Sequence, residues 1–524
     1  MRAQNKIATI SVKRKEQKEH CLSVRRETRR VEPVGTVTMY LEFVDEETKD
    51  AMVSALSKAY DLHDFTHLIC DRVCTEETTE QLVFMAVHFA ALFFDFTALD
   101  RIAKAHGGLP IIRPDLFYGT ALQGNPEDFE KVRYAADEVL AHNPPDWLAL
   151  EMYLVKLEAE NEEYPKELHS SSTLETIEGI LEKQPEFDFY RSRVLDTLTM
   201  RAIRDGDTER GLELNQSAID NAEKHDDINR LAHLLRTKAG ILESSDREET
   251  QRLLLRSRDL MKQLGDKGGF ADVLFLLSKA ESIRGNYNAA IDYNLESVSI
   301  WESIGMPVGM FALNLSTLYN VIGDSEAGFE WAKMAENELS SKPMWQPRAI
   351  LNEAWSMTLQ KKYSEASAII DGIRESINKS GLESNLGWLY FVVSVLDAAE
   401  EDFFSAATNV EESLEIYERH SGYVSFYICL QHRAKIEVYE TILTQSHDTD
   451  KATGPWLQSL EEKARREDLP GILAQALLLK ATLFDGIGNP IEAKRVVKEL
   501  AFLVNNNELD FLRGALSRLS RSID

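Results

Sequence analysis

The sequence predicts an all-α protein built as a solenoid of stacked antiparallel helix pairs. Three periodic features predict this fold: a turn signature, a second glycine marker and a small residue, each recurring about every 39 residues. Hydrophobic residues make up 44% and charged residues 28% of the 524 residues, as in a folded, soluble chain. Because only 26 glycines and 14 prolines interrupt this length, long helices fit the composition better than many short strands.

The turn signature pairs a residue that ends one helix with a residue that begins the next. It occurs at Gly206-Asp207, Ser245-Asp246, Gly285-Asn286, Gly323-Asp324, Lys361-Lys362, Glu401-Asp402 and Gly488-Asn489. Successive spacings are 39, 40, 38, 38, 40 and 87 residues, and the last fits two repeats with a lengthened turn over 445–455. Glycine adopts the left-handed conformation that ends a helix, and Asp or Asn accepts the N–H bonds that start one. Each occurrence therefore predicts a helical hairpin.

A second glycine marks the opposite end of the hairpin. It occurs at Gly265, Gly305, Gly381 and Gly422, with spacings of 40, 76 and 41 residues. The spacing of 76 fits two repeats, with Pro343 and Pro347 marking the turn that lacks glycine. Two interleaved markers with one period predict two helices in each repeat.

A small residue follows each turn signature by five positions. The seven residues are Gly211, Thr250, Ala290, Gly328, Ala366, Ala406 and Ala493. A small side chain lets two antiparallel helices approach closely where they cross. We therefore expect these positions to be buried between the helices of each pair.

The unit 268–297 combines Gly285-Asn286 with an aromatic residue, Tyr287, and the small Ala290, and the next unit carries Asn314 and Tyr319 in its first helix. These features resemble the tetratricopeptide repeat. That family's usual period is ~34 residues, so the chain is similar to a long-repeat subset found in cell-polarity adaptors and in the sensor arm of maltose-regulon activators. The resemblance covers about 190–505 and implies a right-handed superhelix with a concave groove lined by the first helix of each pair.

We expect five segments along the chain. These are a basic segment at 1–38, degenerate helical pairs at 39–106, a Gly/Pro-rich connection at 107–125, the repeat solenoid at 126–506 and a capping helix at 507–524. The first segment carries ten Lys and Arg against four Asp and Glu, and is expected to be either a disordered arm or an extension of the gene model before Met39.

The formal charge of −28 disfavours nucleic acid and anionic membranes as partners, because both are bound mainly through Lys and Arg. Four cysteines in this length do not form a disulfide framework and favour a cytoplasmic location. The most apolar stretch, 82–94, contains His88 and is too short to span a bilayer, so we expect a helix buried on most sides.

His63, His67, Cys70 and Cys74 carry side chains that bind zinc, at spacings of four, three and four on one helix face. Eleven residues of helix span about 16 Å, so the four side chains do not reach one metal ion. The same spacing is typical of a buried apolar stripe, in which Cys is a small hydrophobe. We therefore predict no metal site and no cofactor.

The segment Gly323-Asp324-Ser325 is superficially similar to a serine-hydrolase motif, but it lies at a predicted helix–helix turn and follows no strand. Phosphate-binding, dinucleotide-binding and zinc-protease motifs do not occur in the sequence. These observations predict that the protein is not an enzyme.

The resemblance also implies where a partner binds. In tetratricopeptide domains that hold a peptide's terminal carboxylate, asparagine and basic residues occupy fixed positions of the first helix, and Asn314, Asn352 and Arg348 match these positions. Arg236 matches one of them in its own repeat. An Asn amide donates to and accepts from a peptide backbone, and Arg holds a carboxylate with two bonds.

We therefore expect a scaffold or adaptor that binds a protein or peptide in its concave groove. The partner is expected to be basic or to carry a free carboxylate. The alternative is a ligand-sensing regulatory arm that acts on a separate effector protein.

Overall fold

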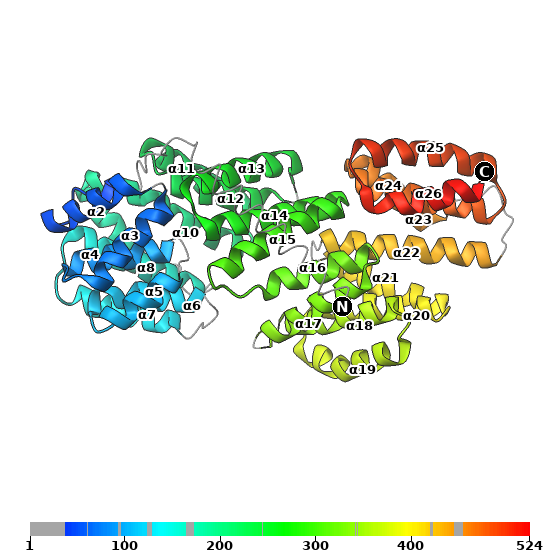
Figure 1. The fold of residues 1–524 in the computed structure, drawn as a ribbon, viewed down its shortest axis with the longest axis horizontal. Helices are drawn as coiled ribbons and strands as arrows, with labels where there is room; N and C mark the ends of the chain where they lie inside the picture. The colour runs from blue at the N-terminus through cyan, green and yellow to red at the C-terminus, as the bar shows by residue number, and fades with distance from the viewer. Residues whose placement is uncertain are drawn as a thin grey trace.

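The computed structural model describes residues 37–59, 61–92, 96–122, 128–163, 172–243, 245–340, 342, 344–419, 423–444 and 454–523. These residues form 25 α-helices and three short 3-10 helices, and none of them lies in a strand. The helices follow one another along an elongated array (Figure 1). The prediction of an all-α solenoid is confirmed. Residues 1–36, Pro343, Gly422 and most of the lengthened turn lie outside the described residues.

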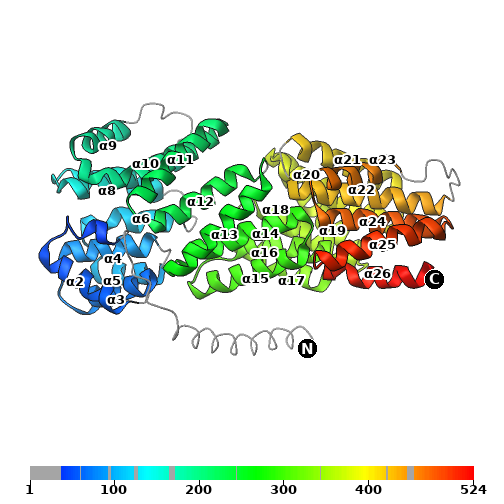
Figure 2. The same ribbon diagram turned by 90° about the horizontal axis from the view of Figure 1, so that it is seen from above.

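The N-terminal part is a group of helices at one end of the array (Figure 2). Its elements are η1 (Thr38–Tyr40), α2 (Glu46–Lys58), α3 (Leu62–Thr75), α4 (Glu80–Leu92), α5 (Phe96–His106), η2 (Pro110–Ile112), α6 (Arg113–Leu122), α7 (Asp128–Leu140), α8 (Asp146–Glu163), α9 (Ser172–Lys183) and η3 (Pro185–Tyr190). Every residue from Leu82 to Ala90 of α4 is buried, as the sequence predicts for this helix. No helix among the described residues has the length and apolar character needed to cross a membrane.

Part of the expected Gly/Pro-rich connection at 107–125 is helical. Pro110 begins η2 and Pro114 is the second residue of α6. Proline is tolerated in the first turn of a helix because the N–H it lacks has no partner there. The prolines in this stretch therefore start helices rather than separate them.

Eight helix pairs follow among the described residues. They are α10 (Arg191–Arg204) with α11 (Thr208–Lys224), α12 (Ile228–Leu242) with α13 (Arg247–Leu264), α14 (Lys267–Arg284) with α15 (Tyr287–Ser303), α16 (Gly309–Val321) with α17 (Ser325–Glu338), α18 (Gln346–Leu359) with α19 (Tyr363–Ser380), α20 (Glu383–Ala399) with α21 (Phe403–Arg419), α22 (Tyr423–Leu443) with α23 (Pro455–Arg466), and α24 (Pro470–Gly486) with α25 (Pro490–Asn506). A final helix, α26 (Asp510–Ile523), packs against α24 and α25.

The turn chemistry matches the prediction. Six of the seven signature positions have a positive φ, including Lys361 (62°) and Glu401 (67°), which adopt the left-handed conformation without glycine. The next residue caps the second helix in most turns: Asp207, for example, accepts from the backbone N–H of Arg210. All seven small residues five positions later are buried. A Cβ added to Gly328 would overlap the Asn320 amide, which confirms the close helix approach expected there.

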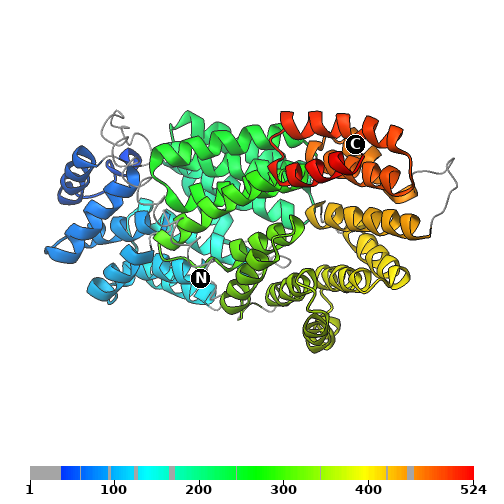
Figure 3. The ribbon, with the colours of Figure 1, turned by 45° about the vertical axis from the view of Figure 1, so that its right-hand side comes forward.

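The second half of the solenoid closes on itself. Helices α22 and α24 contact α14, and α26 contacts α15, so helices far apart in the chain lie side by side (Figure 3). The guanidinium of Arg247 lies 2.8 Å from the carboxylate of Glu467, and the rings of Tyr287 and Phe511 meet at 5.4 Å. The expected continuous open groove is therefore interrupted in this half of the chain.

Side chains of the first helices fill the interior of the closed half. Ile283, Trp355, Trp388, Phe391 and Ile472 come from four different repeats, and all belong to one buried cluster. A helix that is apolar on more than one face has to be covered on more than one side. The closure buries the inner faces of these helices against helices from distant repeats.

The closure brings the backbones of two glycines, Gly285 and Gly471, into close contact. A Cβ added to Gly471 would lie 2.3 Å from the carbonyl oxygen of Gly285, and a backbone atom has little freedom to move away. We expect Gly471→Ala to lower the free energy of unfolding by about 1–3 kcal/mol through overpacking. Chemical denaturation and small-angle scattering would measure the loss and any opening of the closed half.

Gly372 in α19 provides the matched control, because no neighbouring atom would lie within 4 Å of an added Cβ. Gly372→Ala is expected to stabilise the helix by roughly 0.8–1 kcal/mol. Equal effects of the two substitutions would contradict the proposed tightness of the Gly285–Gly471 contact.

Candidate binding pocket

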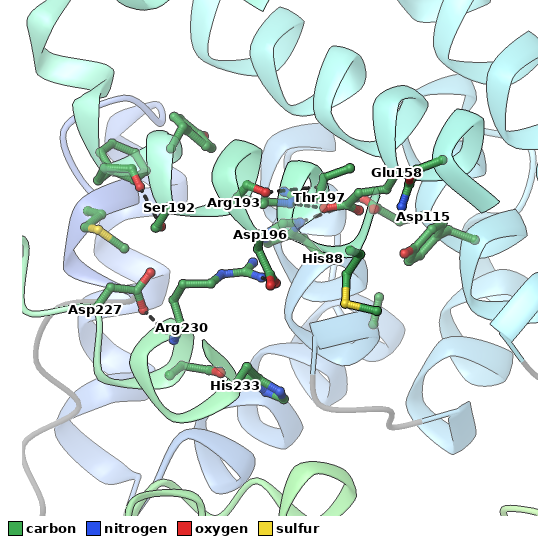
Figure 4. Close-up of a pocket in the computed structure, with 18 of the residues that line it drawn as sticks. His88, Asp115, Glu158, Ser192, Arg193, Asp196, Thr197, Asp227, Arg230 and His233 are labelled. Atoms are coloured by element: carbon green, nitrogen blue, oxygen red, sulfur yellow. Dashed lines mark hydrogen bonds and ion pairs between the residues drawn. The ribbon is translucent and has the colours of Figure 1, made fainter. Parts of the chain in front are cut away.

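A pocket of about 280 Å³ lies where the solenoid begins. Helices α10 and α12 line one side of it, and α4, α6, α8 with η1 and η3 line the other. Figure 4 shows its charged side chains, which come from both the N-terminal helices and the first two helix pairs. The lining residues precede, along the chain, the helices α14, α15, α22, α24 and α26 that make the closure contacts.

Arg193 of α10 holds the two sides of the pocket together. Its Nη1 donates to Glu151 Oε2 at 2.6 Å, and its Nε and Nη2 donate to the two carboxylate oxygens of Glu158 at 2.6 and 3.0 Å. The Tyr40 hydroxyl also donates to Glu151, at 2.9 Å. Charge-assisted bonds of this kind are strong in a buried setting, so they fix α10 against α8.

His88 and Asp115 lie beside this ion pair. His88 Nδ1 is 4.0 Å from Asp115 Oδ2 and 3.9 Å from Glu151 Oε2. Burial lowers the pKa of His88 and, with Glu151 nearby, raises the pKa of Asp115 to about 7. Two groups whose pKa values are shifted in opposite directions by burial are typical of functional sites.

The inner face of α12 supplies the other charged wall. Arg230, His233 and Arg236 follow at spacings of three and therefore share this face. Arg230 Nη1 lies 3.5 Å from Asp196 Oδ2, and Figure 4 shows these two side chains pointing toward each other. His233 Nε2 lies 3.0 Å from Asp266, and Arg236 pairs with Asp272 of α14. The charged surface thus extends from the pocket to the third helix pair.

The four residues expected to line the groove are placed differently from one another. Arg236 lines the pocket. Asn314 is partly buried and donates to Ser278 Oγ at 3.3 Å, while Arg348 lies over the Trp388 ring at 4.6 Å and donates to Ser425.

Asn352 is fully buried, with 0% of its surface exposed. Its amide donates to Ser316 and Thr317 and accepts from Trp388 Nε1 at 2.8 Å, so it connects α16, α18 and α20. In this structure the side chain contributes to packing between first helices.

The histidines and cysteines of α3 make local contacts. His63 Nε2 and His67 Nε2 lie 3.0 Å apart, and Cys70 is buried against α4. Desolvation raises the pKa of Cys74. Within the described ranges, no group of three or more His, Cys, Asp or Glu residues is placed to hold a metal ion.

The sequence prediction missed most of this pocket. Its N-terminal half comes from helices without the repeat signature, so no register indicated which side chains share a face. Two signals were present: the spacing of three that links Arg230 and His233 to Arg236, and a histidine at the centre of the apolar helix α4. A buried charged or titratable residue of this kind requires a partner.

Comparison with models of known protein families finds no match for this chain, and comparison with curated proteins finds none either. Among solved structures, the chain is similar to a Rap protein complexed with Competence and Sporulation Factor, with 13% identity, 63% of this chain and 97% of that chain covered, and a TM-score of 0.43. It is also similar to the apo form of RapI, with 13% identity, 74% of this chain and 98% of that chain covered, and a TM-score of 0.44. Yeast Tom70 is similar at 10% identity, with 85% of this chain and 96% of that chain covered and a TM-score of 0.32.

All three TM-scores lie below 0.5. The class of the present chain follows from its own helices: it is an all-α solenoid of tetratricopeptide-like helix pairs, closed in its second half and carrying a polar pocket at its start.

The raised pKa of Asp115 predicts a pH-dependent stability. The folded state keeps this proton up to about pH 7, whereas the unfolded chain releases it near its ordinary pKa of 3.8. Between these values the folded state binds more protons, so the contribution of Asp115 to the free energy of unfolding falls as pH rises, by at most about 1.4 kcal/mol per pH unit. Asp115→Asn removes this loss.

We therefore expect the melting temperature of Asp115→Asn, relative to wild type, to increase from pH 5 to about pH 7.5 and then to level off. Differential scanning calorimetry at a series of pH values measures this difference. A difference that is constant across the range would show that Asp115 titrates normally in the folded protein.

Proposed function

We propose that this chain is a binding scaffold that recognises a segment of a partner protein or peptide, with the pocket between α10, α12 and the N-terminal helices as its docking site. The observation that carries the proposal is the position of the pocket: it is a polar, accessible hollow on the inner face of the first helices. Farther along the solenoid, apolar side chains of α18, α20, α22 and α24 are buried together in one cluster. Recognition is therefore concentrated at the start of the repeats.

The surroundings of the pocket support binding of an extended segment. From Arg236–Asp272 the charged surface continues to Lys279, whose Nζ lies 3.1 Å from Glu243. Partly exposed charged side chains along neighbouring first helices offer polar contacts beyond the pocket itself. Many modest contacts of this kind are typical of recognition by helical repeats.

A ligand-sensing regulatory arm is the second candidate. The pocket volume of about 280 Å³ favours it, because this size is near the lower end of small-molecule sites, which occupy roughly 300–1,000 Å³. The pocket also joins the N-terminal helices to the solenoid, so a bound small molecule would contact both parts. The same variants test both candidates.

Met200 lines the pocket and is 39% exposed, so a larger side chain there would obstruct the entrance. We expect Met200→Trp to weaken binding of peptides selected by the wild-type chain from a displayed random library by at least tenfold. Fluorescence anisotropy measures the affinities, and circular dichroism checks that the helices are retained.

Met334 in α17 is the matched control, because it is 38% exposed and lies away from the pocket. Met334→Trp is expected to leave peptide affinity within twofold of wild type. Equal losses in both variants, or selection of no peptide, would contradict the proposal. Stabilisation by a small molecule that Met200→Trp abolishes would instead support the sensing arm.

A further inference from the structure

The charges at the pocket are unbalanced. Seven carboxylates line it or pair with the residues that do: Asp115, Glu151, Glu158, Asp196, Asp227, Asp266 and Asp272. Three guanidiniums face them, those of Arg193, Arg230 and Arg236, and each is already paired with a carboxylate. Burial lowers the pKa of His88 and so disfavours its cationic form. When all seven carboxylates are ionised, the pocket carries an excess of negative charge. Because the pKa values of Asp115, Asp196 and Asp272 are raised, this excess grows as pH increases.

The hydrogen-bonding groups are unbalanced in the same direction. Three buried oxygen acceptors in side chains that line the pocket, Asp115 Oδ2, Asp196 Oδ1 and Asn161 Oδ1, have no hydrogen-bond partner among the described residues. Against them stand two donors without an acceptor among those residues, the Asn229 amide Nδ2 and the Tyr190 hydroxyl, both in side chains that line the pocket. A buried acceptor without a donor is unfavourable by roughly 1–3 kcal/mol. A ligand rich in donors would satisfy these oxygens.

Asp196 is the most accessible of the incompletely paired carboxylates. Its side chain is 20% exposed, one oxygen lies 3.5 Å from Arg230 Nη1, and the other has no hydrogen-bond partner among the described residues. Asp115 lies deeper in the pocket, with 8% of its side chain exposed. The two carboxylates thus line one pocket at different depths, and both have acceptor capacity left.

An ammonium group has three donors and a guanidinium has five, and neither has an acceptor. In a site with a low effective dielectric constant, either cation would be attracted by the excess carboxylates. An anion would have to displace Glu151, Glu158 or Asp272 from its arginine. The pocket volume fits the end of one side chain better than a folded segment.

We propose that the pocket receives the cationic end of a Lys or Arg side chain from a partner peptide, with Asp196 as the main counter-charge and Asp115 as a second acceptor. This assignment rests on the proposed function and names the chemistry that its docking site recognises. Arg193 keeps its structural pairs with Glu151 and Glu158, while the incoming cation takes the acceptors that they leave unused.

The directions of the pKa shifts in the pocket agree with this assignment. Burial raises the pKa of Asp196, and burial together with Glu151 and Glu158 raises that of Asp115, while Arg193 opposes the latter shift. His88 of α4 also faces Asp115. Arg230, His233 and Arg236 of α12 oppose the shift of the Asp196 pKa, while Glu158 of α8 adds to it. A bound cation favours the ionised carboxylates, so affinity for it should rise as pH increases from 6 to 8.

The test uses the full chain and labelled Gly/Ser peptides that each carry one central residue. Peptides with Arg or Lys are expected to bind at least tenfold more tightly than peptides with citrulline, norleucine or Glu, as measured by fluorescence anisotropy. Asp196→Asn keeps the size of the side chain, removes its charge and is expected to reduce the affinity for the Arg peptide at least tenfold.

Asp371→Asn in the exposed part of α19 is the control for the loss of one negative charge, and is expected to change affinity less than twofold. Equal binding of the Arg and citrulline peptides, or preferred binding of the Glu peptide or inorganic phosphate, would overturn the cationic assignment. If Met200→Trp still weakened other selected peptides, the scaffold function would stand without it. Free agmatine could bind as tightly as the Arg peptide, with an affinity that Asp196→Asn reduces. That result would support a cationic ligand and contradict a peptide as the source of the cation.

Discussion

In the pairs from α14 to α24, the first helix of each pair is apolar on two faces. The rest of the structure depends on keeping both of these faces out of water. One face packs against the second helix of the same pair, as in any stacked hairpin. The opposite face would meet water if the solenoid stayed open, and exposed apolar surface is unfavourable by about 25 cal/mol per Å². Bringing α22 and α24 back to α14 removes that surface from water. The curvature of this half of the array is therefore set by burial of its inner faces.

In the first two helix pairs, the inner faces are charged rather than apolar. The inner faces of α10 and α12 carry Arg193, Asp196 and Arg230, which need charged partners rather than apolar cover. The N-terminal helices supply those partners through Glu151 and Glu158. A buried ion pair of this kind fixes orientation more than it adds stability. The same bonds that hold the N-terminal helices in place therefore also create the polar pocket.

The sequence was informative where local chemistry decides structure. A left-handed residue followed by a capping side chain marks a turn without reference to the rest of the chain, which is why Gly206 and Gly488 were placed correctly. Closure depends on the rotation between successive pairs, to which many side chains contribute slightly, so it was not visible in any one motif. Asn352 shows the limit: its repeat position suggested a groove, but Trp388 from the next repeat covers its amide. The pocket was missed because half of its residues lie in helices without a repeat register.

The ion pair between Arg247 and Glu467 joins positions 220 residues apart in the chain. In an open solenoid each repeat contacts only its neighbours, so stability is lost gradually from the ends and folding spreads from any point. Here the last helix pairs share a hydrophobic core with the third pair. They can therefore fold completely only after the chain between them has been brought together as a long closed loop. The second half should therefore form and unfold as one cooperative unit, so that removing α24–α26 would expose residues in the middle of the chain and not only at its end.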